Sequence, residues 1–155
     1  MLLTIAEAGT ADLETVRRMF RAYADALPFS LDYQGFAAEL AGLPGAYAAP
    51  GGCLLLAWRE GLALGVAGLR RLNGEIAEIK RLYVLPEARG IGLGRRLAEQ
   101  ALAAARARGY RRVRLNTHRP SMAAAIALYL SLGFVEVPPY GPDLDGAIAF
   151  FEKRL

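Results

Sequence analysis

The sequence contains little cysteine and no long apolar run. Its single cysteine, Cys53, excludes an internal disulfide and favours a reducing cytoplasm. Cys53 opens the apolar segment CLLLAW, which predicts an ordinary core residue. No stretch of about 18 consecutive apolar residues is present, so no membrane-spanning helix is expected. The opening MLLTIAEAG lacks the basic segment of a secretory signal, and no signal peptide is expected.

Histidine and lysine are also scarce. One histidine and one cysteine cannot form a Cys/His cluster with metal-ligand spacing, so no metal site is expected. The net charge is +4, but residues 70–119 carry +9 and the rest of the chain carries −5. The basic segment suits a polyanionic ligand, although a solvated, arginine-rich helix face gives a similar count.

Apolar periodicity predicts one α/β domain over residues 1–155. The 54% apolar content is sufficient for a buried core. The element order β-α-α-β-β-β-α-β-α-β-β predicts a mixed sheet with helices on both faces. The expected strands are 2–8, 53–59, 62–72, 75–85, 110–117, 134–137 and 147–155. The expected helices are 10–27, 30–43, 95–109 and 121–133, with Thr10, Ser30 and Ser121 as N-caps.

The strand expected at 75–85 has an irregular face. Strict alternation puts Glu78 and Lys80 on the same face as Leu82 and Val84, so this face changes from polar to apolar. A β-bulge near Lys80 and Arg81 explains the change. A strand whose second half is buried on both faces explains it equally well.

The segment RGIGLGR, residues 89–95, is the main candidate for a ligand-binding loop. It lacks the Gly-Lys-Ser/Thr ending of a P-loop, and neither register of its glycines gives G-x-G-x-x-G. A loop that only needs positive φ angles is one interpretation. The other is an anion site, because free N–H groups at a helix N-terminus attract phosphate and the flanking arginines add positive charge.

Together with its neighbours, this loop resembles the GNAT superfamily of N-acetyltransferases. RGIGLG at 89–94 is similar to the family's Q/R-x-x-G-x-G/A loop for the pyrophosphate of acetyl-CoA. AEIKRLYVLPEARG before the loop and ALYLSLGF at 127–134 resemble the adjacent motifs. The loop alone is weakly specific, but the ordered set is strongly specific. The resemblance covers about residues 53–155 and implies a GNAT fold, N-acetyltransferase activity and acetyl-CoA (coenzyme A) as co-substrate.

The resemblance also implies how the cofactor is held. Backbone N–H groups of residues 91–95 bind the pyrophosphate, and the strand edge at 82–84 pairs with the pantetheine amides. A bulge that splays this strand from the next one would expose that edge. Asn116 would contact the cofactor or a water, although a turn or capping role fits it nearly as well. The implied cofactor-binding residues are Leu82, Tyr83, Val84, Arg89, Gly90, Ile91, Gly92, Leu93, Gly94, Arg95, Asn116 and Tyr129.

Three residues are implied to act in catalysis. The Leu82 N–H would stabilise the acetyl oxyanion, and the Tyr129 hydroxyl would protonate the departing sulfur. Helical spacing alone would make Tyr129 a core residue. Glu78 is the candidate base. Alternatively, Glu78 is a surface residue paired with an arginine, and a chain of water molecules removes the proton of the amine. His118 is either a second base or an ordinary loop histidine.

The acceptor is expected between the first two helices and the last strands. The candidate binding residues there are carboxylates and aromatics: Phe29, Asp32, Tyr33, Tyr140, Asp143 and Asp145. They predict a small amine or amino-acid-like acceptor, although solvated turns are an equal interpretation. A small-molecule acceptor is the expected partner, with neither nucleic acid nor membrane, and a homodimer is compatible with the sequence.

Two other functions remain open. One is acetylation of a protein N-terminus or lysine, which needs an open groove. The other is a non-catalytic module that senses coenzyme A or binds nucleic acid through the arginine-rich segment 106–114.

Overall fold

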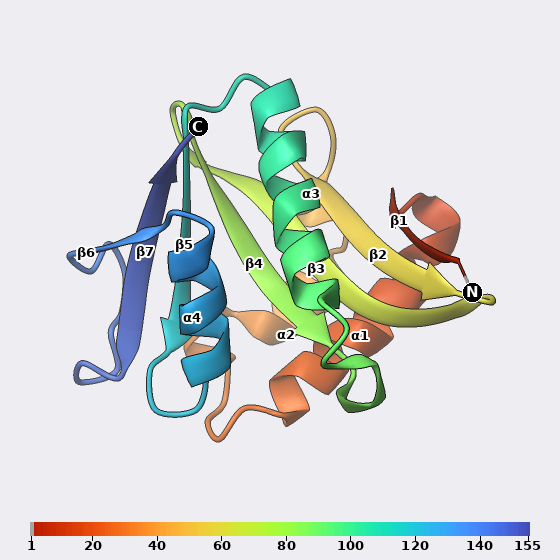
Figure 1. Cartoon of the computed structure of the whole chain (residues 1–155), viewed down its shortest axis with the longest axis horizontal. Helices are drawn as coiled ribbons and strands as arrows, with labels where there is room; N and C mark the ends of the chain where they lie inside the picture. Colours follow the sequence, from red (N-terminus) through yellow and green to blue (C-terminus); the bar gives the residue numbers. More distant parts are fainter. Residues whose placement is uncertain (1) are drawn as a thin grey trace.

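The computed structural model describes residues 2–155 and contains one seven-stranded mixed sheet (Figure 1). The strands lie in the order β1-β2-β3-β4-β5-β7-β6, and β4 and β5 form the parallel pair. The strands are β1 (Leu3–Glu7), β2 (Cys53–Arg59), β3 (Leu62–Asn73), β4 (Ile76–Val84), β5 (Arg112–His118), β6 (Val135–Val137) and β7 (Ile148–Arg154). The α-helices are α1 (Leu13–Asp25), α2 (Phe36–Ala41), α3 (Leu93–Ala107) and α4 (Ala123–Ser131).

Helices cover both faces of the sheet, which confirms the expected architecture (Figure 1). The core beneath α1 contains Val16, Met19 and Phe20 packed against β2 and β3. The core on the opposite face holds the apolar side of α3 and Tyr129 of α4. The two long helices, α1 and α3, therefore each bury one apolar face against the sheet, as their periodicity predicts.

The N-caps and first residues of three helices differ from those predicted from the sequence. Residues Thr10–Asp12 form a 3₁₀ turn, and the Asp12 carboxylate, not Thr10, bonds the Gly9 N–H at 3.0 Å. The expected helix at 30–43 is split at Gly35, whose φ of 70° is left-handed, into a 3₁₀ turn and α2. Ser30 accepts the Asp32 N–H at 3.1 Å but lies before the cap position of the turn, Leu31, and caps no α-helix. The proposed Ser121 cap is wrong, because its hydroxyl bonds the His118 ring instead.

The irregular face of β4 arises from a β-bulge at Arg81. Its φ is 59°, which is rare for a residue with a side chain. Lys80 lies opposite Gly68 of β3, but Tyr83 lies opposite Val66, so two residues of β4 stand against one of β3. The extra residue shifts the alternation by one, so Leu82 and Val84 point to the opposite face of the sheet from Glu78 and Lys80.

Beyond the bulge, β4 separates from β5. The two strands pair only from Ile76 to Glu78, opposite residues 112–114. The remainder of β4 therefore has an edge that β5 does not cover. Figure 1 shows this opening between the two strands, with the N-terminus of α3 and the length of α4 beside it.

Candidate active site

The glycine loop exposes its backbone. Gly90 and Gly92 have φ angles of 85° and 77°, and an added Cβ at either would meet no atom within 4 Å. Among residues 2–155, no group accepts a hydrogen bond from the N–H groups of 91–95, and the first bond of α3 runs from Arg96 to Gly92. The Arg89 guanidinium bonds the Val84 carbonyl at 3.0 Å. The loop therefore offers free donors at a helix N-terminus, which suits a pyrophosphate.

A groove of about 420 Å³ runs from this loop along the uncovered edge of β4. Its walls come from β4, the start of α3 and the start of α4. Gly94 at the start of α3 faces Leu128 of α4 and Val84 of β4, which lie 3.7 and 3.9 Å from its Cβ position. Of the residues expected to bind the cofactor, the groove is lined by Leu82, Tyr83, Val84, Arg89, Gly90, Gly92, Leu93, Gly94 and Arg95. Ile91 is exposed beside them.

The opening between β4 and β5 holds a small cavity of about 30 Å³. Leu82, Asn116 and Tyr129 line it together, although they come from three different elements. The Tyr129 side chain is buried, and its hydroxyl has no hydrogen-bond partner among residues 2–155. Burial raises the pKa of Tyr129 above its ordinary value. The hydroxyl therefore stays protonated at neutral pH and is free to donate.

Glu78 is the last residue of β4 that pairs with β5, just before the two strands separate, and its side chain is almost fully buried. One carboxylate oxygen accepts Arg70 at 3.0 and 2.8 Å, and the other accepts the Tyr140 hydroxyl at 2.8 Å. Glu78 is thus paired with an arginine, as the alternative interpretation expected, but not at the surface. Both residues line a cavity of about 150 Å³ next to Asn116. Since a carboxylate oxygen accepts more than one bond, Glu78 can also bond a water or an amine.

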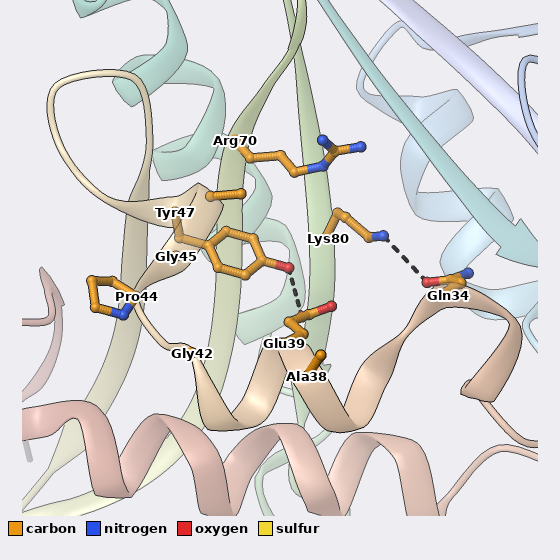
Figure 2. Close-up of a pocket in the computed structure, with 10 residues that line it drawn as sticks. Gln34, Ala38, Glu39, Gly42, Pro44, Gly45, Tyr47, Arg70 and Lys80 are labelled. Carbon is orange, nitrogen blue, oxygen red and sulfur yellow. Dashed lines mark hydrogen bonds between the residues drawn. The ribbon is translucent and has the colours of Figure 1, made fainter.

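A larger cavity, of about 360 Å³, adjoins this one and is lined by α2, the segment 42–47 that follows it, β3 and β4 (Figure 2). Gln34, Arg70 and Lys80 line both cavities. Beneath them the buried Arg81 forms a bidentate pair with Glu39 of α2, at 3.0 and 2.7 Å. Although burial alone would raise it, the pKa of Glu39 is held below its ordinary value by Arg81. The ion pair therefore connects the bulge in β4 to Glu39, which lines the cavity.

Most residues expected to bind the acceptor lie outside these cavities. Tyr140 is the exception. Phe29 packs on the His118 ring, 4.7 Å between centroids, and thereby joins the loop after α1 to the loop after β5. The remaining candidates are exposed and line neither cavity: Asp32, Tyr33, Asp143 and Asp145. The carboxylates that line the two cavities are Glu39 and Glu78 instead of the predicted aspartates.

Three polar cavity residues, Gln34, Arg70 and Lys80, were not predicted as site residues. Gln34 and Arg70 lie in no motif, and the motif that contains Lys80 and Arg81 gave neither of them a role. The parity break in β4 was the available signal for Arg81, since it marked the bulge without showing which side chain the bulge buries. Cys53 is buried, as expected, and burial raises the pKa of its thiol to about 11.

Over residues 2–155, no group of three or more His, Cys, Asp or Glu side chains is arranged to hold a metal ion. Over the same range, none of the helices has the length and apolarity needed to span a bilayer.

Comparison with known proteins assigns the family. The profile of the Acetyltransferase (GNAT) family matches residues 16–134, most of the chain. The chain belongs to the GNAT family of acetyltransferases. This assignment confirms the fold, the enzyme class and the acetyl-CoA co-substrate that the sequence resemblance implied.

Two curated relatives illustrate the family match. An uncharacterized N-acetyltransferase of Schizosaccharomyces pombe is 34% identical over 131 residues, which cover 83% of this GNAT chain and 80% of the relative. A protein of Azospirillum brasilense named IAA acetyltransferase is 39% identical over 103 residues, covering 65% and 67%.

Solved structures share the fold. A GNAT acetyltransferase from Staphylococcus aureus superposes with a TM-score of 0.82 at 20% identity, covering 99% of both chains. The PaiA N-acetyltransferase of Thermoplasma acidophilum, solved in complex with coenzyme A, has a TM-score of 0.76 at 23% identity and full coverage of both chains. At these identities the likeness shows the common architecture.

Proposed function

We propose that this enzyme moves the acetyl group of acetyl-CoA to the primary amine of a small acceptor by direct attack in a ternary complex. The observation that carries the proposal is the opening between β4 and β5. A cofactor-sized groove reaches it from the glycine loop, and separate cavities reach it from the side of α2. Leu82 and Tyr129 lie at the junction. Two substrates can therefore meet there from opposite sides.

The chain fits acetyl-CoA on three observations. The free N–H groups of residues 91–95 suit the pyrophosphate, and Arg95 at the helix start adds charge. The uncovered edge at 82–84 suits the pantetheine amides, because a strand edge pairs with an added extended segment. The groove walls are largely apolar. In the solved complex of the Thermoplasma acidophilum relative, coenzyme A is bound to the same fold.

Three residues of the chain have separate roles in the transfer. Acetyl-CoA supplies the activated acetyl thioester. The Leu82 N–H stabilises negative charge on the acetyl oxygen as the C–N bond forms. Tyr129 gives its proton to the sulfur as the C–S bond breaks. Glu78 takes the proton of the amine, directly or through water, and its buried pair with Arg70 fixes its position.

The acceptor cavities favour a small molecule. They measure about 150 and 360 Å³ and lie beneath the segment around Gln34, which suits an amine the size of an amino acid. Acetylation of peptides but not free amines would favour the protein-acetylating alternative.

The decisive experiment compares wild type with Tyr129→Phe in acetyl-CoA turnover across amines, amino acids and peptides. Loss of the acid should lower kcat by about 100-fold while leaving KM for acetyl-CoA nearly unchanged. Tyr110→Phe is the matched control, because its hydroxyl bonds the Gly51 carbonyl in the core beside α3. Unchanged turnover in Tyr129→Phe would remove the acid role. No transfer to any acceptor by a protein that binds coenzyme A would overturn the proposed function.

Glu78→Gln tests the base separately. The variant keeps the shape of the side chain and its bond from Tyr140 but removes the proton acceptor. A base role predicts a rate lower by about 100-fold and an altered pH–rate profile. An unchanged profile would assign the proton to a water chain and leave Glu78 as a partner of Arg70.

A further inference from the structure

Lys80 is a half-buried cation without a carboxylate partner. It extends from β4 into the 360 Å³ cavity, where its ammonium bonds the Gln34 side-chain oxygen at 3.2 Å (Figure 2). Within residues 2–155, no carboxylate oxygen lies within the 4.0 Å that defines an ion pair with it. Burial, with Arg81 nearby, lowers the pKa of Lys80 below its ordinary value. An uncompensated charge at such a site is unfavourable.

The surrounding charges are otherwise matched. Glu39 pairs with Arg81 and also accepts the Tyr47 hydroxyl. Glu78 pairs with Arg70 and accepts the Tyr140 hydroxyl. Lys80 is therefore left as one excess positive charge between two satisfied pairs. An anion that entered the cavity would be its missing counter-ion.

Lys80 also occupies the junction of the acceptor route. With Gln34, it lines the 360 Å³ cavity, the 150 Å³ cavity and the small cavity that contains Leu82 and Tyr129. A ligand anchored at Lys80 by one end can thus extend its other end toward the opening between β4 and β5. The positive charge lies on the acceptor side of β4, away from the groove along the glycine loop.

We propose that the acceptor amine also carries a carboxylate, and that Lys80 binds this carboxylate while the amine faces the opening between β4 and β5. The inference rests on the proposed acetyl transfer and adds the class of acceptor. It replaces an acceptor held by aspartates with one held by a lysine. Arg70, on the neighbouring strand, lines the same two cavities, but its charge is matched by Glu78, so Lys80 supplies the unpaired positive charge (Figure 2).

The test uses matched acceptors. Steady-state acetyl transfer is measured for several amino acids, for their primary amides and for the corresponding decarboxylated amines. Wild type should prefer each amino acid over its amide by about 30-fold in kcat/KM, because a charged hydrogen-bonded pair is lost. Lys80→Gln should lose that preference mainly through KM for the amino acid, with the amide almost unaffected. Lys80→Arg should keep most of it.

Lys153→Gln is the matched control, since it removes the only other lysine charge from β7 on the far side of β5. It should leave the preference unchanged, and an equal loss in this variant would overturn the inference. Equal use of amino acids and amides by wild type would overturn it too. An equal fall of kcat on all acceptors in Lys80→Gln, with an altered pH profile, would make Lys80 a base and not an anchor. Transfer confined to amines without a carboxylate would overturn this inference and leave the proposed function standing.

Discussion

The ion pair between Arg81 and Glu39 gives a sharp test of how the bulge is held. Arg81 is 2% exposed at its side chain and Glu39 17%, and they are 2.7 Å apart. Glu39→Gln keeps the shape of the side chain but leaves the guanidinium buried without its counter-charge. Removing one partner of a buried pair costs about 3–5 kcal/mol, and the residual exposure of Glu39 favours the lower end, about 3 kcal/mol.

That loss should lower the melting temperature by about 6–12 °C, because about 1 kcal/mol corresponds to 2–4 °C in a domain of this size. Glu14→Gln is the control: its pair with Arg17 is 3.0 Å long, but Glu14 is 75% exposed. An exposed pair contributes about 0–1 kcal/mol, so the control should fall by no more than about 4 °C. Differential scanning fluorimetry at pH 7 measures both.

The stability difference between wild type and Glu39→Gln should also become smaller at acidic pH. Since Arg81 lowers the pKa of Glu39 in the folded state, the pair stabilises the fold fully above the unfolded pKa, about 4.3. The contribution is lost as pH falls from there through the folded pKa. The gap between wild type and Glu39→Gln should be constant from pH 6 to pH 8, on the order of 3 kcal/mol, and shrink below about pH 4. A difference in melting temperature under about 2 °C at pH 7 would show that the Arg81–Glu39 pair does not stabilise the fold.

Two further predictions concern the glycine loop and the cysteine. Gly92→Ala should weaken coenzyme A binding in calorimetry and lower stability by about 1–2 kcal/mol, because an alanine at φ 77° is strained. Gly61→Ala, at φ 78° in the β2–β3 turn, should lose the same stability but bind coenzyme A normally; equal binding by both variants would exclude the loop. Cys53, whose pKa is raised to about 11, should resist thiol reagents at pH 8 until denaturant is added. Rapid labelling of the native protein would contradict its burial.

Much of the fold could be predicted from the sequence, because glycine and proline mark the boundaries of its helices and strands. Asn73-Gly74 marks the β3–β4 hairpin, Pro86 follows β4, and Gly109 follows α3. The order and type of strands and helices follow from these breaks and from apolar periodicity. The exact helix starts do not follow, because short polar side chains also bond nearby backbone groups outside the helix; the Asp12 carboxylate, for example, accepts the Gly9 N–H and caps no N–H of α1.

The acceptor side was the least predictable part of the site. Arg81 and Glu39 are 42 residues apart in the sequence, and Lys80 and Gln34 are 46 residues apart. No local pattern specifies such pairs, because they depend on how α2 packs against β4. The cofactor side was more predictable, since the loop, the edge at 82–84 and the start of α3 are neighbours in sequence as well as in space.

A crystal structure of the protein with coenzyme A tests the central claim most directly. We expect the pyrophosphate on the N–H groups of residues 91–95 and the pantetheine along the edge at 82–84. We also expect the thiol within hydrogen-bond distance of the Tyr129 hydroxyl in the opening between β4 and β5. A coenzyme whose thiol lies away from this opening, with Tyr129 contacting only core side chains, would contradict the claim.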